Sequence, residues 1–251
     1  MRPIEIALDA ALLVMRSGGS TPAAERSFAN IIKAFRQDVE SVVWRLDFIA
    51  ATQKTEGKLA TVVRPVGQIG INLYRASEVA VLGERAARGE VSPAEIETEV
   101  ARIQHLRSPY RPWLTILVAA ATAACFAQIP GTLDLGASAV AFTAAAVGQL
   151  VRIQLQGRGV TVAPITLICG LLSSLIGAGG LRLGFSQDQA TVLLGSILYL
   201  VPGLPLINGF IDMISHRHLF IGMERMLNAA FLFLVVGLTI AIAHNLVLGG
   251  G

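Results

Sequence analysis

The stretch Ser108-Pro109-Tyr110-Arg111-Pro112-Trp113 separates two parts of the chain that differ in composition. Residues 1–112 carry 28 charged side chains, 15 Lys or Arg and 13 Asp or Glu, whereas residues 113–251 carry only 9. A bilayer core is about 30 Å thick, and a charge at its centre costs about 2.5–3.5 kcal/mol on insertion scales. We therefore predict that the second part crosses a membrane and that the first lies in water.

The second part consists of apolar stretches separated by short polar or Pro/Gly-containing breaks. A spanning helix needs about 20 apolar residues, and this spacing predicts five spans. We expect them at about residues 113–129, 133–151, 160–181, 188–213 and 226–247. The first break is Pro130-Gly131. Small residues in the second and third spans indicate close helix packing, with the lining of a polar path as the alternative.

Residues 1–108 are predicted to form a small α+β domain, the N-terminal head. Helical spacing and start signals predict helices at about 4–16, 21–37, 70–88 and 93–107. Alternating residues predict a strand at 40–52, and the Val- and Thr-rich stretch 59–66 is expected to pair with it as a hairpin through a turn at 54–57. Thr21 is expected to cap the second helix together with Glu25, and Ser92-Pro93-Ala94-Glu95 is a clear helix start.

The arginines near the span ends predict the orientation. With the head in the cytoplasm, one arginine, Arg182, faces outward and six face the cytoplasm: Arg107, Arg111, Arg152, Arg158, Arg217 and Arg225. The positive-inside rule then gives a cytoplasmic N-terminus and an external C-terminus. The predicted fold class is a membrane α-helical bundle of five transmembrane helices with an N-terminal cytoplasmic α+β domain. Arg152 and Arg158 are interpreted as topology anchors.

Several classes of function have little support in the sequence. The formal net charge is +3 and no basic stripe with aromatic residues appears, so no nucleic-acid partner is expected. Cys125 and Cys169 lie in apolar runs and are expected to be small buried residues, and His216 and His218 are expected in a solvated loop rather than a metal site. No catalytic, cofactor or ATP-binding motif is present, so we predict neither an enzyme nor a cofactor.

The fourth span contains the strongest candidate site, Leu198-Tyr-Leu-Val-Pro-Gly-Leu-Pro-Leu-Ile-Asn-Gly-Phe-Ile-Asp212. Two prolines and two glycines in eight residues cannot continue a regular helix. In hydrocarbon, such backbone survives where protein or a wet cavity surrounds it, and transporters bind substrates at such breaks. Asn208 and Asp212 are four residues apart and share one helix face. The predicted substrate-binding residues are Tyr199, Pro202, Gly203, Pro205, Asn208 and Asp212; a structural kink, with Asp212 at the span end, is the alternative.

This segment resembles the hallmark of the threonine/serine exporter (ThrE) family, a Pro-Gly-x-Pro sequence followed by an Asn and then an Asp. The resemblance covers nearly the whole chain, and weaker matches lie in the head at Gly18-Gly19-Ser20-Thr21, Asn72-Leu73 and Ser92-Pro93-Ala94-Glu95. The length is similar to the shorter, split-gene version of the family. The resemblance implies a second small five-span membrane subunit, of the YjjB type, or less favourably a homo-oligomer.

The family implies the function. Its members are associated with export of threonine and serine, and the split pair with export of succinate. We therefore expect a subunit of a secondary exporter in the bacterial inner membrane that moves a small polar metabolite, driven by an ion gradient or by the substrate's own gradient. The alternative is a membrane-anchored receptor or regulatory protein whose soluble head binds a ligand or partner. An anchor needs no broken helix, so the break favours transport.

Overall fold

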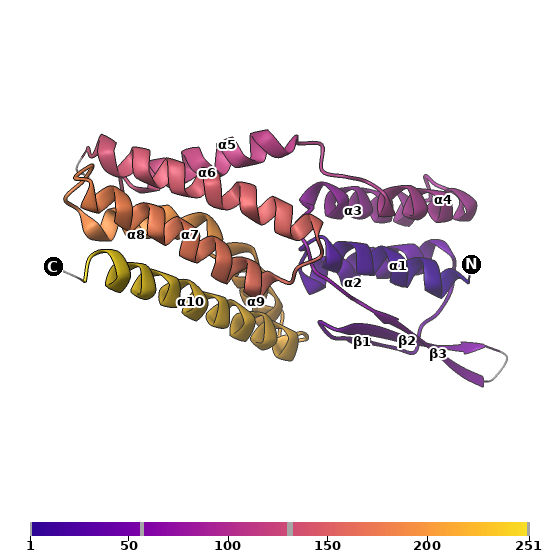
Figure 1. Ribbon diagram of the computed structural model, residues 1–251. Coiled ribbons are helices and arrows are strands. Elements are labelled where there is room, and N and C mark those ends of the chain that lie inside the picture. Colours follow the sequence, from indigo (N-terminus) through magenta and orange to yellow (C-terminus); the bar gives the residue numbers. More distant parts are fainter. Residues whose placement is uncertain (1, 56–57, 130–132, 250–251) are drawn as a thin grey trace. The chain divides into compact units, whose positions relative to one another are not determined.

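The computed structural model describes residues 2–55, 58–129 and 133–249, which are mainly helical with one small sheet (Figure 1). Contacts divide the chain into two compact units. The first unit comprises Met1–Pro109 together with Gly203–Asn228, and the second unit comprises Tyr110–Pro202 together with Ala229–Gly251. The predicted division into an aqueous part, 1–108, and a membrane part, 113–251, stays a prediction.

Helix α1 (Pro3–Arg16) is the core of the first unit. Ten of its side chains are buried, because its apolar residues surround the whole helix rather than one stripe. It contacts α2 (Thr21–Ala34), α3 (Leu73–Ala87) and α4 (Pro93–Gln104), and also the sheet. Figure 1 shows α1 and α2 between the sheet and the pair α3–α4. The four predicted head helices are therefore confirmed, with ends that differ by up to three residues.

The sheet has three antiparallel strands in the order β1 (Ser41–Trp44), β2 (Phe48–Thr55) and β3 (Lys58–Pro65). The prediction of one strand over 40–52 was wrong, because the chain turns back between Trp44 and Phe48. Arg45 N donates to Phe48 O at 3.0 Å and closes that turn. Ile49 and Val62 are buried on the face toward α1. The predicted 54–57 turn lies partly outside the described residues.

The second helix begins differently from the prediction. Ser20, not Thr21, is the N-cap residue, and its side chain makes no capping hydrogen bond. The start of α4 does follow the sequence signal: Ser92 N donates to the Glu95 carboxylate at 2.7 Å, and Glu95 N donates to Ser92 Oγ at 3.4 Å. The capping box at Ser92 is confirmed, and the cap of α2 must come from elsewhere.

Two further helices of the first unit come from the far end of the chain. Helix α9 (Gly203–Ile214) and the beginning of α10 (Leu219–Val247) form a tight hairpin. A Cβ on Gly222 would lie 2.8 Å from Gly209 O, so glycine at this position lets the two helix backbones approach.

The second unit contains α5 (Pro112–Phe126), α6 (Leu135–Gly157), α7 (Val162–Arg182), α8 (Gln189–Ile197) and the 3-10 turn η1 (Leu198–Leu200). Helix α6 packs against α5, α7 and α8. Asp134 and Asp188 cap α6 and α8 by accepting from Ala137 N at 2.8 Å and Thr191 N at 3.1 Å. Cys169 is buried as expected, but Cys125 is exposed because α5 leaves that face uncovered within the described chain.

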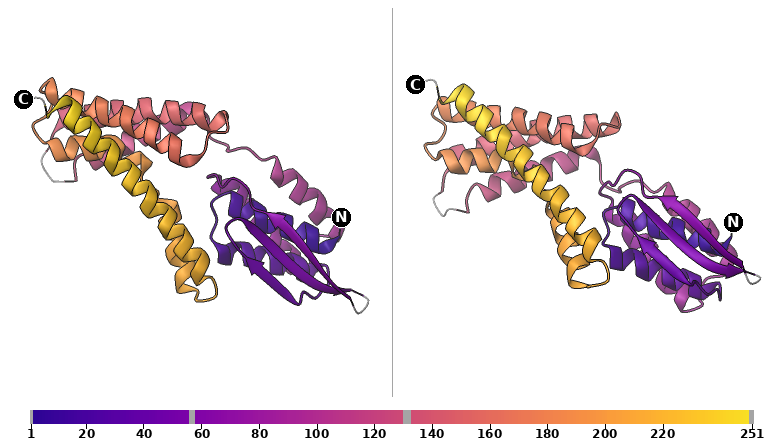
Figure 2. Two further views of the ribbon diagram at one scale, coloured as in Figure 1. Left: turned by 60° about the horizontal axis from the view of Figure 1, so that its bottom comes forward. Right: turned by 90° about the horizontal axis from the view of Figure 1, so that it is seen from below.

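Three helices of the described chain are long and apolar enough to cross a membrane, namely α6, α7 and α10. Figure 2 shows α10 as a single uninterrupted helix. The bent pair formed by α8–η1 and α9 raises the number to four if it counts as one span. Helix α5 is apolar but has only 15 residues. A multi-pass membrane protein is thus supported, whereas the count of five spans stays a prediction. The predicted Pro130-Gly131 break lies outside the described residues.

Candidate functional site

The predicted break in the fourth apolar stretch is present. Regular helix ends at Ile197, the chain passes through η1, and α9 begins at Gly203. Pro205 is the third residue of α9, where the backbone N–H has no partner within the helix, so its missing N–H costs no hydrogen bond. Pro202 directly precedes the helix. The two prolines therefore start a new helix instead of distorting a continuous one.

Asp212 lies on the buried face of α9 and is completely inaccessible to solvent. Its carboxylate accepts hydrogen bonds from Thr21 N and Thr21 Oγ1, both at 2.9 Å. Arg225 of α10, which is 5% exposed, places its Nε 2.9 Å from Asp212 Oδ2. An acid near a helix N-terminus is favourable because the first N–H groups carry partial positive charge. Asp212 is thus the missing cap of α2 as well as the partner of a buried arginine.

Asn208, one turn earlier on the same face, also binds the N-terminal segment. Its Nδ2 donates to Gly18 O at 2.7 Å, and Arg225 Nη2 donates to Gly19 O at 3.3 Å. Gly18 has a φ of +85°, and a Cβ there would lie 2.8 Å from the Leu204 side chain. The turn between α1 and α2 therefore requires glycine at this position, both for its conformation and for the approach of α9.

These contacts give the Asn208–Asp212 face of α9 a structural role. Replacing one partner of a buried ion pair leaves an uncompensated charge, which is strongly unfavourable. The charges of Asp212 and Arg225 are matched, and both oxygens of Asp212 have partners inside the first unit. In this arrangement the two side chains join α9 to α2 and the preceding turn. Direct contact of Asn208 and Asp212 with a substrate stays a prediction.

The other half of the motif lies in the second unit. Tyr199 is half-buried, and its hydroxyl lies 3.0 Å from Ser173 Oγ, which in turn donates to Ala144 O at 3.0 Å. A Cβ on Gly148 would lie 1.8 Å from the Tyr199 hydroxyl, so the absence of a side chain there makes room for the phenol. Arg152 Nη1 donates to Tyr199 O at 3.2 Å.

Sequence reasoning did not place Arg152 at the motif, since it interpreted this arginine as a topology anchor. A signal was available: Arg158 already provides a cation at the end of α6, and Arg152 lies six residues inside the helix, about 9 Å along its axis. Ionisable side chains within membrane helices are rare and usually functional. Gly203 also leaves open space, because no atom of the described residues lies within 4 Å of its Cβ position.

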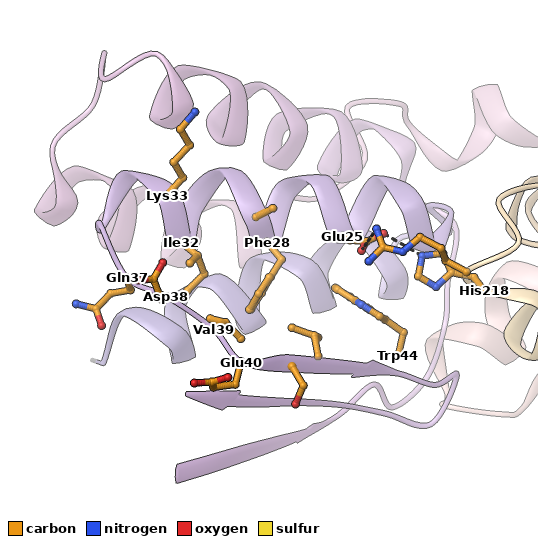
Figure 3. A pocket seen from close by; sticks show the side chains of 14 residues that line it. Glu25, Phe28, Ile32, Lys33, Gln37, Asp38, Val39, Glu40, Trp44 and His218 are labelled. Carbon is orange, nitrogen blue, oxygen red and sulfur yellow. Dashed lines mark hydrogen bonds and ion pairs between the residues drawn. The ribbon is translucent and has the colours of Figure 1, made fainter. Parts of the chain in front are cut away.

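A cavity of about 560 Å³ lies between α2 and β1 in the first unit (Figure 3). Phe28 and Trp44 meet edge to face in it, with ring centroids 6.1 Å apart. Asp38 and Glu40 lie toward one end of the cavity, and His218 toward the other. The cavity therefore combines an aromatic wall with acidic side chains.

His218 is not the solvated loop residue that the sequence suggested. It is 6% exposed, its Nε2 lies 3.0 Å from the Glu25 carboxylate, and its ring lies edge-on to Trp44. The expectation was wrong because the loop between α9 and α10 folds onto α2. Arg217 also pairs with Glu25, at 3.2 Å. Among the described residues, no group of three or more His, Cys, Asp or Glu side chains could hold a metal ion.

The family and the relatives that match this chain are all named as transport proteins. The threonine/serine exporter family (ThrE) matches residues 5–247. Two relatives carry the name "Probable succinate transporter subunit YjjP". The protein from Klebsiella aerogenes is 28% identical over 243 residues, which cover 96% of this chain and 92% of the relative. The protein from Escherichia coli K12 is 27% identical over 248 residues, which cover 94% and 92%. No solved structure matches the chain significantly.

Proposed function

Because the chain belongs to the threonine/serine exporter family, we propose that it is one subunit of a secondary exporter for a small metabolite that carries a carboxylate. Membership of this family makes it a membrane transport protein and not an enzyme. The family name refers to threonine and serine, and the two relatives are named for succinate. Every one of these compounds carries at least one carboxylate, so the proposal is limited to that shared chemistry.

The observation that carries this proposal is the interrupted helix at Val201–Pro205. A membrane anchor has no use for a break in an apolar segment, whereas transporters place substrates at such breaks. Here the helix ends at Ile197 and restarts at Gly203. We propose that the backbone at Pro202, Gly203 and Pro205, together with Tyr199, contributes to the substrate path. Asn208 and Asp212 are proposed to hold α9 in place beside it.

The proposed exporter needs a second subunit. Both relatives are named as subunits, and each match covers 92% of the relative's length. Five spans in this chain would place its two ends on opposite sides of the membrane. A second five-span unit of the YjjB type would then complete an inverted repeat, the arrangement in which many transporters build their site. A homo-oligomer is the less favoured assembly.

Efflux measurements test the proposal directly. This chain and a YjjB-type partner are reconstituted together and separately in vesicles loaded with radiolabelled succinate, threonine or serine. We expect efflux of at least one substrate from the pair and little from either protein alone. Full activity of this chain alone as a monomer would contradict the need for a partner.

The break is tested by Pro202→Ala combined with Pro205→Ala. We expect this variant to be inserted in normal amounts but to lose most of its efflux, because alanine favours continuation of the helix. Normal efflux from a well-expressed double variant would show that the break serves another purpose.

The orientation of the chain is tested with reporters. We propose that the head is cytoplasmic and that the C-terminus is external, as the arginine distribution predicts. A reporter fused before Met1 is expected to behave as cytosolic, and one fused after Gly251 as translocated. Two ends on the same side would mean an even number of spans, and the arginine argument would fail.

A second candidate function is regulation through the head, and the cavity between α2 and β1 favours it. A regulatory ligand in this cavity would place an apolar group on Phe28 and Trp44 and an amine near Asp38 and Glu40. Binding of free amino acids to the purified full chain can be followed by tryptophan fluorescence, with Trp44→Phe as the control. A signal that persists in the control would come from Trp113 and count against this site.

A further inference from the structure

We infer that Arg152 binds a carboxylate of the exported substrate, beside the break in the fourth apolar segment. This inference rests on the proposed function and names the contact through which the substrate class would be recognised. Arg152 lies in α6, whose apolar length qualifies it as a membrane span.

In the part of the chain that the structure describes, the charge of Arg152 has no countercharge. Within residues 2–55, 58–129 and 133–249, no carboxylate pairs with it, and the ionisable groups near it are Tyr199 and Cys169, which are neutral at ordinary pH. The side chain is half-buried, so water does not fully solvate it. An arginine in a membrane helix is unfavourable unless another group pairs with it. A substrate carboxylate is a group that would pair with it.

The guanidinium is held in position by the backbone of the motif. Arg152 has five N–H donors, and the described chain uses one, the 3.2 Å hydrogen bond from Nη1 to Tyr199 O. Tyr199 is itself fixed through Ser173 on α7, with its phenol in the space that Gly148 leaves open. The remaining donors form a planar fork, which matches the two oxygens of a carboxylate.

Alternative explanations make different predictions. If Arg152 were a topology anchor, it would be redundant with Arg158, which lies exposed just after the end of α6. A lipid phosphate could also bind a guanidinium, since the two anions share their oxygen chemistry. Binding of a lipid phosphate would depend on the lipid composition and not on the exported solute. The test therefore varies the solute, the arginine and the lipid.

The first measurement is binding to the purified exporter, this chain with its YjjB-type partner, in a neutral detergent. Thermal unfolding is recorded with succinate, with threonine, and with succinamide, which has the same shape but no carboxylate. We expect the wild type to be stabilised by at least one carboxylate and not by succinamide. Arg152→Gln should lose this stabilisation, Arg152→Lys should keep part of it, and Arg158→Gln should retain it.

The second measurement is transport in vesicles. A charge-assisted hydrogen bond is worth about 1.5–3 kcal/mol, so we expect KM for the transported carboxylate to rise about ten- to hundredfold in Arg152→Gln. Arg158→Gln should stay within about twofold of the wild type. Vesicles of purely zwitterionic lipid and vesicles with anionic lipid should give the same ratio between wild type and Arg152→Gln.

The possible outcomes separate the inference from the proposed function. An unchanged KM and unchanged stabilisation in Arg152→Gln would overturn the inference, as would equal losses in Arg158→Gln. A ratio that changes with anionic lipid would assign Arg152 to a lipid phosphate. If the wild-type exporter transports none of these solutes, the proposed function fails. In that case, carboxylate binding that depends on Arg152 would still support the inference, and its absence would reject it.

Discussion

Arg225 and Arg152 are the same residue type in two different surroundings. Arg225 lies in the first unit, 5% exposed, with Asp212 at 2.9 Å and the Gly19 carbonyl at 3.3 Å. Arg152 lies in the second unit, where one backbone carbonyl is its partner in the described chain. A matched buried charge stabilises one arrangement of helices, whereas an unmatched one remains available for an anion. The contacts of Arg225 assign it a structural role, whereas those of Arg152 are the basis for proposing that it recognises a ligand.

Loss of the matched charge should have the largest effect. Asp212→Asn keeps the shape of the side chain but leaves Arg225 buried without a counterion, so we expect about 3–5 kcal/mol of destabilisation. The measurement is unfolding of the full chain in detergent. Asp188→Asn is the matched control, because asparagine caps a helix about as well as aspartate and should change stability by less than about 0.5 kcal/mol. Combining Asp212→Asn with Arg225→Met should recover part of the loss. If Asp212→Asn were as stable as Asp188→Asn, the pairing of Asp212 with Arg225 would not stabilise the fold.

Crowding the unmatched site should have an intermediate effect. In Gly148→Ala the new Cβ would lie 1.8 Å from the Tyr199 hydroxyl and 2.4 Å from Ser173 Oγ, so Tyr199 must move. Overpacking of this kind costs about 1–3 kcal/mol. We also expect weaker transport, because Tyr199 O orients Arg152. The control is Gly179→Ala, where no described atom lies within 4 Å of the Cβ position. If both alanine variants transport normally, the orientation of Arg152 does not depend on Tyr199.

The contacts of the partly exposed Glu25 with Arg217 and His218 should matter less. Glu25→Gln weakens the contacts to His218 and to Arg217, whose side chain is 77% exposed. Such pairs are worth about 0.2–1 kcal/mol. The expected result is a small loss of stability together with a change in Trp44 fluorescence, since Trp44 touches His218. The control is Glu90→Gln, in an exposed ion pair with Arg88, which should change neither the stability nor the Trp44 fluorescence. A loss of several kcal/mol in Glu25→Gln would mean that the Glu25 contacts are as important for stability as the Asp212–Arg225 pair.

The smallest effect concerns two acids on α1. Partial burial raises the pKa of Asp9 despite the nearby Arg64, whereas a hydrogen bond from Arg2 lowers the pKa of Glu5. A raised acid pKa gives stability that is present below the unfolded value of 3.8 and is lost as pH rises through the folded pKa. Asp9→Asn should therefore match or exceed the wild type in stability at pH 7, with the advantage shrinking toward pH 4. Glu5→Gln should show the opposite trend, and parallel behaviour of the two would contradict these assignments.

Sequence reasoning succeeded where the signal was local. Ser92 caps the helix that follows it, and the prolines of the motif lie where one helix has ended and another starts. It failed where a partner was distant. Thr21 looked like a local cap, yet Asp212 supplies that cap, and His218 is buried by a strand and a helix that precede it by more than 170 residues. A long-range contact of this kind produces no periodic pattern in the sequence, because a single residue in each of two distant segments is enough to form it.

Strand prediction failed for a related reason. Residues 40–52 alternate between apolar and polar types through Arg45 and Asp47, so the pattern looks continuous across a turn. The contact of Arg152 with Tyr199 was also missed, because an arginine close to a span end fits the positive-inside rule whether or not it has another function. The place of Arg152, six residues before Arg158, was the hint that the sequence offered, whereas its contact with Tyr199 O is known only from the folded chain.

The cap that Asp212 gives to α2 joins residues 191 positions apart in the chain. A ribosome adds about 5–20 residues per second, so the N-terminal helices are synthesised about 10–40 s before their cap exists. During that interval the beginning of α2 and the Gly18-Gly19 turn lack the groups that later bind them. The contacts of Asn208, Asp212 and Arg225 with this region can form only after the hairpin of α9 and α10 has been synthesised. Completion of the first unit is thus linked to synthesis of nearly the whole chain, and a product truncated before Asp212 would lack the cap of α2.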